Sequence, residues 1–363
     1  MPATSFAMNA IGACDAIRAE ATDMAGQNAP FNLGRATGAL DFITDPQNDV
    51  GLTADVVSSD SVKVTTLRIL YDQRTKPCQV STDPNTNVCS DTLTTVTRKQ
   101  ALVDIDKKIT TPGRYFSNSD MVVLCKGTKE FIQQRLLNDL RAARERLDEV
   151  ILAEMNAREG KRYGWDGTTT AAGTYASLQL LSIQNGQDIP LPGNYENIIM
   201  DYQNMQFSGV PAIIGQGYLD KFMKLQQMAC CNSATPYGQA IAGANAAYYF
   251  DQAANNVLGA NKVLVLPYRI LHLLTFNKNN NIGINEPLEA HTVITDPENP
   301  RLKWNLDFKW DCATEQWRYE YSLHWTLFNV FQTDSFGSDT GTPDCGDELS
   351  GMTGVIGYQI TRS

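Results

Sequence analysis

The sequence predicts an α+β protein, and three stretches carry that prediction. Residues 128–159 repeat apolar side chains every three or four positions, as an amphipathic helix does. Residues 301–331 alternate apolar and polar side chains, which is typical of an antiparallel hairpin with one buried face. Residues 61–106 contain two runs rich in Thr and Val on either side of a turn at Asp83-Pro84, which predicts a second hairpin.

Composition bounds the class of protein. The chain has 363 residues, 42% hydrophobic and 19% charged, enough for a folded core in one large or two to three smaller domains. The formal net charge of −10 argues against strong direct binding of nucleic acid, which needs a basic surface. No apolar stretch reaches 18 residues and the first residues lack a basic leader, so we expect neither a membrane-spanning helix nor a secretory signal.

Eight cysteines are present, but no CxxC spacing occurs and the chain has three histidines, so no zinc site is predicted. Cys78 and Cys89 lie symmetrically about the Asp83-Pro84 turn and would face each other if that turn closes a hairpin. Because no secretion signal is recognised, free thiols are favoured, and a Cys78–Cys89 disulfide is the alternative.

The N-terminal part predicts little self-contained structure. Residues 1–50 read as an extended arm with one short helix within 8–25, interrupted by Gly, Asn and Pro. The hairpin over 61–106 has too few apolar residues to anchor a core of its own, so we expect it to project from the body. Because long exposed strands are prone to aggregate unless a partner covers them, this hairpin implies self-association.

The helix over 128–159 is expected to begin at Thr128 and to end at Gly160. Thirty residues make a rod of about 45 Å, which favours a spine laid across a sheet over a short coiled coil. Its apolar positions are Ile132, Leu136, Leu140, Ala143, Leu147, Val150, Ile151 and Met155.

Residues 200–290 carry mixed signals. The stretch 210–231 reads as a buried strand, a glycine turn and a helix, 246–259 as a further helix, and 261–277 as strand and turn around Pro267. The turn contains Gly215 and Gly217, the first part of a dinucleotide-binding fingerprint. Asp220 stands where that fingerprint needs its third glycine, and its charge would repel a pyrophosphate, so we interpret the turn as a tight corner.

The hairpin over 301–331 holds four of the five tryptophans, so one face is expected to pack on something large, such as the long helix. The aromatic residues of this expected core face are Trp304, Phe308, Trp310, Trp317, Tyr319, Tyr321 and Trp325.

No catalytic, cofactor-binding or metal-binding residue is predicted. Two Asp- and Asn-rich loops, 45–55 and 83–92, lack the glycine and the glutamate of a calcium-binding loop. His272 lies in an apolar run and is expected to be a buried core residue, and His324 falls on the polar face of the hairpin. No nucleophile motif accompanies these two or His291, and the carboxylates of Asp148 and Glu149 are interpreted as solvated charge on the helix.

This order of elements resembles the major capsid proteins of tailed double-stranded DNA bacteriophages, which have the Hong Kong 97-type fold. The wording of residues 209–238, and of 261–281 followed by 291–311, is similar to that family, and the resemblance spans most of 30–360. It rests on patterns of packing and turns, and it carries no crosslinking residue onto this chain.

The resemblance implies six segments. They are an N-terminal arm (1–50), an extended loop (51–110), a peripheral domain with the spine helix (111–199), an axial domain (200–290) containing the Gly215–Gly217 corner, a peripheral return hairpin (291–340), and a C-terminal segment with a closing strand (341–363).

It also implies a function: a structural subunit that forms pentamers and hexamers of an icosahedral head, assembled in the host cytoplasm. Partners would be further copies, a portal, and scaffolding and decoration proteins. Double-stranded DNA would be enclosed without sequence-specific binding. No cofactor, enzyme activity or membrane is implied.

Four alternatives stay open: an encapsulin-like compartment, another virion component such as a tail tube, an enzyme with a site built from scattered residues, and a carbohydrate-binding β protein that uses the aromatic hairpin. The last is disfavoured because the aromatic face has to be the core.

Overall fold

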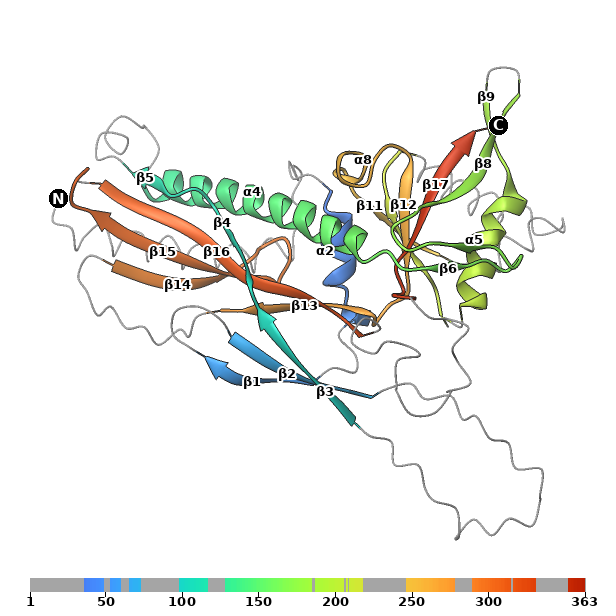
Figure 1. Ribbon diagram of the computed structural model, residues 1–363. Helices are drawn as coiled ribbons and strands as arrows, with labels where there is room; N and C mark the ends of the chain where they lie inside the picture. The colour runs from blue at the N-terminus through green and yellow to red at the C-terminus, as the bar shows by residue number, and fades with distance from the viewer. Residues whose placement is uncertain are drawn as a thin grey trace, which may run out of the picture.

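The computed structural model describes residues 36–48, 53–59, 65–72, 98–116, 128–184, 187–205, 207, 209–217, 246–277, 289–314, 316–330 and 352–362. Within these ranges the chain has few helices and many strands, which confirms the α+β prediction. Figure 1 shows an elongated molecule with one sheet along the long helix, a second sheet at the other end, and a small sheet that stands off the body.

The long helix and the aromatic hairpin form the first lobe. Helix α4 packs on the longest strand, β16, whose neighbours run in the order β13-β16-β15-β14, with β4 and β5 also pairing to β16. The elements are α4 (Thr128–Ala157), β4 (Lys107–Thr110), β5 (Arg114–Phe116), β13 (Leu271–Phe276), β14 (Glu289–Thr295), β15 (Lys303–Asp311) and β16 (Gln316–Asn329). The helix ends three residues before Gly160.

The second lobe is a six-stranded sheet of order β11-β10-β12-β17-β8-β9. Its elements are β8 (Ala176–Gln184), β9 (Gln187–Pro190), α5 (Pro192–Asn204), β10 (Ala212–Gly215), β11 (Ala247–Phe250), α8 (Ala254–Val257), β12 (Lys262–Leu266) and β17 (Ile356–Arg362). The last strand of the chain lies between β12 and β8. A two-stranded hairpin, β6 (Arg162–Tyr163) and β7 (Thr169–Thr170), lies beside α5. The expected peripheral segment 111–199 is therefore divided, since its part from 176 onward lies in this second sheet.

The predicted helix over 246–259 is wrong in its first half. Tyr248, Tyr249 and Phe250 extend beside β10 as strand β11, and only the four residues of α8 are helical. Aromatic side chains favour strands, and the parallel pairing with β10 supplies the backbone hydrogen bonds that a helix would otherwise provide. Asp251 then starts the helical turn, because its Oδ1 accepts the N–H of Ala253 at 2.8 Å.

Helix α2 (Gly38–Ile43), followed by a 3₁₀ turn at Pro46–Asn48, was not predicted from the sequence. It lies between the two lobes and contacts α4, β10, β11 and β13 (Figure 1). Ala39, Leu40 and Phe42 are fully buried there. This part of the N-terminal segment therefore belongs to the core. The short helix expected within 8–25 lies outside the described residues.

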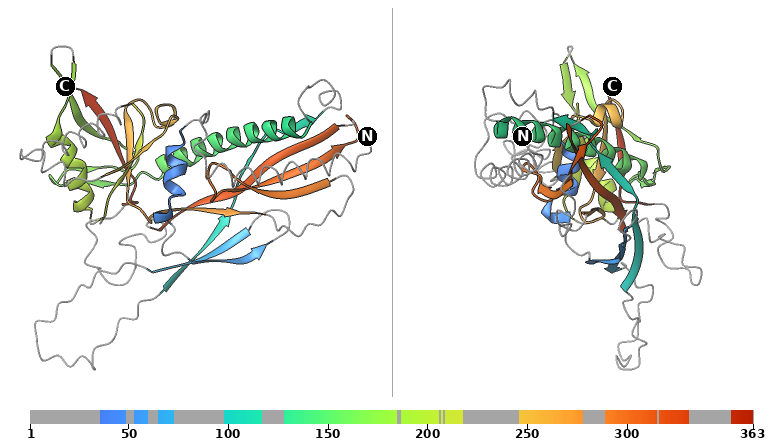
Figure 2. Two further views of the ribbon diagram at one scale, coloured as in Figure 1. Left: turned by 180° about the vertical axis from the view of Figure 1, so that it is seen from behind. Right: turned by 90° about the vertical axis from the view of Figure 1, so that its left-hand side faces the viewer.

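The third sheet has three antiparallel strands in the order β1-β2-β3. They are β1 (Thr53–Ser59), β2 (Thr65–Asp72) and β3 (Arg98–Ile105). Both further views show this sheet to one side of the body (Figure 2). The expectation that it lacks core residues is wrong at its base, where Ile69 is fully buried and packs with Phe328 of β16. The turn with Cys78 and Cys89 lies outside the described residues.

Candidate functional site: the lobe joint and the clamped β6–β7 hairpin

The aromatic face of the β15–β16 hairpin is packed against helix α4. Trp304, Phe308, Tyr319, Tyr321 and Trp325 are each at most 3% exposed. Trp310 is half-buried and lies opposite Trp317 in the strand register. The description of Trp317 is limited to its backbone.

Two tyrosines of this face hold the helix directly. The hydroxyl of Tyr319 donates to Asp139, and the hydroxyl of Tyr321 donates to the carbonyl of Leu136 at 3.1 Å. Burial, followed by the carboxylate of Asp139, raises the pKa of Tyr319 well above its ordinary value. Tyr319 therefore stays a hydrogen-bond donor, and these contacts set the rotation of α4 on the sheet.

The Gly215–Gly217 turn is a packing corner of the second lobe. A Cβ on Gly215 would lie 2.7 Å from Cγ1 of Val263 on β12, closer than real contacts allow. Gly217 has φ +75°, a left-handed conformation that favours glycine. Close strand packing and the turn account for both glycines. The helix predicted after the turn, including Asp220, lies outside the described residues.

His272 is buried, and its Nε2 lies 3.1 Å from the carbonyl of Arg269, so the structure places it in the core. His324 of β16 is half-buried opposite Lys108 of β4. For His291 the described structure gives only its backbone pairing to Asp307.

The interpretation of Asp148 as solvated charge is wrong. Its side chain is fully buried, and its Oδ1 accepts the N–H of Leu40 at 3.1 Å. Asp251, also fully buried, accepts the N–H of Ala39 at 3.0 Å. Two carboxylates from distant parts of the chain thus satisfy the first amides of α2, which is how negative charge stabilises a helix N-terminus. Glu149, on the adjacent position of α4, forms an exposed pair with Arg146.

A second ionic cluster joins α4 to the turn between β14 and β15. Arg144 pairs with Glu298 and lies 3.8 Å from Asp296, while Nε of Arg141 donates to Glu298 at 2.7 Å. Burial raises the pKa of Asp296, and Arg144 opposes that rise. The cluster fixes the entry of the return hairpin against the helix.

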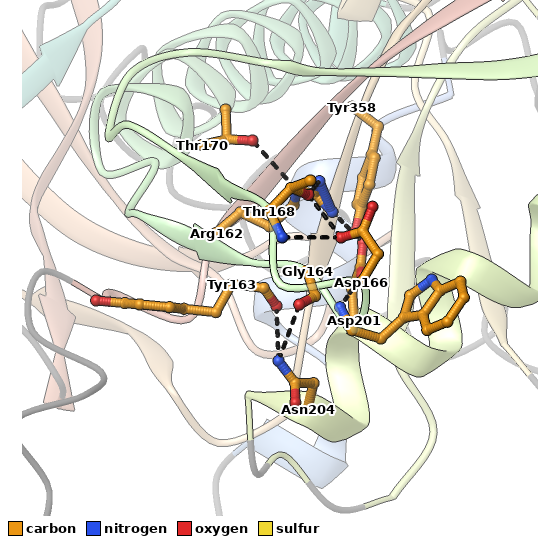
Figure 3. A network of polar contacts seen from close by, with 10 residues as sticks. Arg162, Tyr163, Gly164, Asp166, Thr168, Thr170, Asp201, Asn204 and Tyr358 are labelled. Atoms are coloured by element: carbon orange, nitrogen blue, oxygen red, sulfur yellow. Dashed lines mark hydrogen bonds and ion pairs between the residues drawn. The ribbon is translucent and has the colours of Figure 1, made fainter.

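The β6–β7 hairpin is clamped through Asp201 of α5, a residue that is 2% exposed (Figure 3). Its Oδ2 accepts from Nη1 of Arg162 at 2.5 Å and from the hydroxyl of Tyr358 at 2.8 Å. Its Oδ1 accepts the N–H of Trp165 at 3.0 Å. Burial and the neighbouring carboxylate raise the pKa of Tyr358 well above its ordinary value, so the phenol remains a donor.

Further contacts complete this clamp. Nη2 of Arg162 donates to the hydroxyl of Thr168 at 3.1 Å, and Asp166 accepts from the same residue's N–H and hydroxyl. Nδ2 of Asn204 lies 3.2 Å from the carbonyls of Tyr163 and of Gly164 (Figure 3). Two-residue strands are too short to be stable alone, so the hairpin owes its shape to these contacts.

The sequence did not predict this network. Pro192 at the first turn of α5 was the usable signal for that helix. The pairing of Arg162 with Asp201 had no local signal, because the two residues are 39 positions apart.

Glu159 lies where the chain leaves α4 for the second lobe. It is 6% exposed and touches Gly357 of β17, so closely that a Cβ there would lie 2.5 Å from its Oε1. Burial raises the pKa of Glu159 from 4.5 to about 7, against the opposing effects of Lys262 and of a hydrogen bond from the backbone of Gly357.

Other kinds of site were considered over the same ranges. Within the described part of the chain, no group of three His, Cys, Asp or Glu side chains is arranged to hold a metal ion. In the described ranges no helix is long and apolar enough to cross a membrane. Cys312, on the β15–β16 turn, is a free and exposed thiol.

No family model and no curated protein matches this chain. Solved structures from three bacteriophages are similar to it at low identity. A chain of Mycobacterium phage Adephagia aligns with a TM-score of 0.41 at 10% identity, over 84% of this chain and 86% of that one. A chain of Microbacterium phage Oxtober96 gives 0.39 at 10% identity, over 91% and 92%. A chain of the structure described as "Capsid of Ralstonia phage GP4" gives 0.37 at 9% identity, over 84% and 86%.

The alignments thus extend over most of each chain, while the backbones superpose only loosely. Similarity of this degree assigns no family by itself.

Proposed function

We propose that this chain is a major capsid protein of Hong Kong 97 type. It would be a structural, non-enzymatic subunit whose copies form pentamers and hexamers and, through them, the icosahedral head of a tailed bacteriophage.

The observation that carries this proposal is the three-stranded β1–β3 sheet. A sheet in a folded domain is stable when another layer covers its apolar face. Ile69 and Phe328 pack its base against the body, yet in the views of Figures 1 and 2 no described helix or sheet covers the rest of it. Leu102 of β3 is 64% exposed there. A neighbouring copy that covers this surface would supply the missing layer and remove an aggregation-prone edge.

The remaining architecture supports the same proposal. The 30-residue α4 lies along the aromatic hairpin, as a peripheral domain with a spine helix requires. Strand β17 closes the separate six-stranded sheet, as an axial domain requires. On this assignment β8, β9 and α5 belong to the axial domain, so its border lies near residue 176.

The net charge of −10 fits a wall that encloses DNA without binding it tightly. Portal, scaffolding and decoration proteins would be the further partners of such a shell, in the virion and during assembly in the host cytoplasm. An encapsulin-like compartment is the second candidate, because the same architecture would serve a smaller shell around protein cargo.

Sedimentation and electron microscopy of the expressed full chain, with and without reductant, test the proposal. Icosahedral shells, or rings of five and six copies, support it, and their size and contents separate a phage head from a compartment. Stacked rings would indicate a tail tube. A small oligomer that never forms shells, even under crowding or in phage-infected lysate, would refute the capsid assignment. Loss of shells under reductant would implicate Cys78 and Cys89.

A matched pair of variants tests the carrying observation. Leu102→Asp places a charge on the exposed face of β3, where it leaves the subunit core untouched but opposes burial by a neighbour. Lys303→Asp makes an equally abrupt change at an exposed position of β15. We expect Leu102→Asp alone to abolish particles while the thermal unfolding of the subunit stays as in the wild type.

A further inference from the structure

Two exposed apolar surfaces lie at opposite ends of the strand order of the second lobe. The tryptophan patch consists of Trp165, 48% exposed at the β6–β7 turn, and Met200, 40% exposed on α5. The β11-edge patch consists of Val210 and Phe250, 42% and 47% exposed. Helix α5 packs on β8 at one end of the sheet, whereas Phe250 belongs to β11, the edge strand at the other end.

The two members of the tryptophan patch are brought together by Asp201. Met200 precedes Asp201 in α5, and the carboxylate of Asp201 accepts the N–H of Trp165. The patch is therefore built jointly by the hairpin and the helix.

The tip of the β6–β7 hairpin contributes little to the core, since residues 165–169 are all exposed. It is nevertheless fixed by a buried ion pair between Arg162 and Asp201 and by the hydroxyl of Tyr358. Burying charge is costly, and it does not by itself stabilise a fold. What this clamp achieves is to hold an exposed tryptophan in one place.

A tryptophan held in this way has the properties of a binding hot spot. Trp is enriched among the few residues that dominate the binding energy of protein interfaces. Fixing it in advance lowers the entropy lost on association.

The size of the surface limits what can occupy it. A stable complex of two separate proteins buries about 800 Å² on each partner, far more than two side chains supply. The occupant must be held at other surfaces as well, which a neighbouring copy in a shell is. Unlike patches at opposite ends of one sheet suit a head-to-tail contact, the type that closes into rings.

We propose that the tryptophan patch of one copy packs against the β11-edge patch of the next copy in a ring, with Trp165 as the anchor. This inference rests on the proposed function, since it specifies a contact within the shell.

Photo-crosslinking tests the contact in the full chain. Trp165 is replaced by p-benzoylphenylalanine, and assembled particles are isolated and irradiated. We expect a covalent dimer whose joined peptides map to residues 209–217 or 246–258 of a second copy. Particles that yield adducts only within one chain, adducts to another region, or no dimer would overturn the inference while leaving the shell intact. A wild-type chain that forms no particles would refute both.

Two alanine variants provide a quantitative check. Trp165→Ala should raise the protein concentration needed for assembly roughly tenfold, the effect of losing one hot spot, with the unfolding temperature of the subunit unchanged. Tyr115→Ala, which removes another exposed aromatic on β5, is the control and should leave that concentration within about twofold.

The pairing is tested by combining Trp165→Ala with Phe250→Ala. If the two side chains meet, the double variant should be little worse than the worse single variant. Fully additive effects, or an unchanged assembly concentration for Trp165→Ala, would contradict the proposal.

Discussion

Replacing Glu159 with glutamine is expected to stabilise this protein above neutral pH while changing little at pH 5. The side chain is 6% exposed at the end of α4. The groups that face it are the ammonium of Lys262 on β12, the phenol of Tyr175, and the N–H of Gly357 on β17. Burial outweighs Lys262 and the N–H, and it raises the pKa of Glu159 from 4.5 to about 7.

The sign of the pH dependence follows from that rise. A folded-state pKa above the unfolded value means that the folded protein binds the proton more tightly. The corresponding stability is fully present below pH 4.5, is lost as the pH rises from 4.5 to about 7, and stays lost above that. At about 1.4 kcal/mol for each pH unit, the loss is at most about 3 kcal/mol.

Glutamine keeps the volume of the side chain and an oxygen that accepts the N–H of Gly357, but it carries no charge. Urea unfolding of dissociated wild-type and Glu159→Gln subunits at pH 5, 6, 7 and 8 measures the difference in free energy. We expect almost none at pH 5, and a gain for the variant of up to about 3 kcal/mol at pH 8.

Glu196→Gln, on the half-exposed side of α5, controls for the removal of a carboxylate. A difference for Glu159→Gln that stays constant from pH 5 to 8, or a variant that is less stable at pH 8, would refute the reasoning.

Three further substitutions probe the packing of the two lobes. Asp201→Asn should lower the free energy of unfolding in urea by about 3 kcal/mol, because a buried guanidinium loses its counter-charge, and a loss below about 1 kcal/mol would contradict a buried pair. Trp325→Ala should cost about 3–5 kcal/mol through the cavity it leaves, whereas Trp165→Ala should cost less than about 0.5 kcal/mol; equal shifts in thermal unfolding would contradict the observed burial. Gly357→Ala should cost about 1–3 kcal/mol, since its Cβ would meet Glu159 and a tyrosine ring at 2.5 and 2.7 Å, and an unchanged urea midpoint would show that these neighbours give way.

Local periodicity was sufficient to predict the longest elements. The 3.6-residue repeat of 128–159 became α4 to within two residues of its end, and the strict alternation of 301–331 became the β15–β16 hairpin. These patterns succeed because each element buries one face along its whole length, so every turn or pair of residues repeats the same information. Short elements carry no such repetition, which is why six-residue α2 was missed and β11 was mistaken for a helix.

The sequence by itself determined the class of fold, the long helix and its aromatic platform, and the acidic character of the chain. Only the tertiary structure decided which polar residues are buried. Asp148 reads as surface charge on its helix, yet it is enclosed because Leu40, 108 positions away, brings an unsatisfied amide to it. Asp201 is enclosed because Arg162 and Tyr358 converge on it from other elements. Burial of a charge depends on partners that can repay its desolvation, and those partners come from parts of the chain that no local pattern relates.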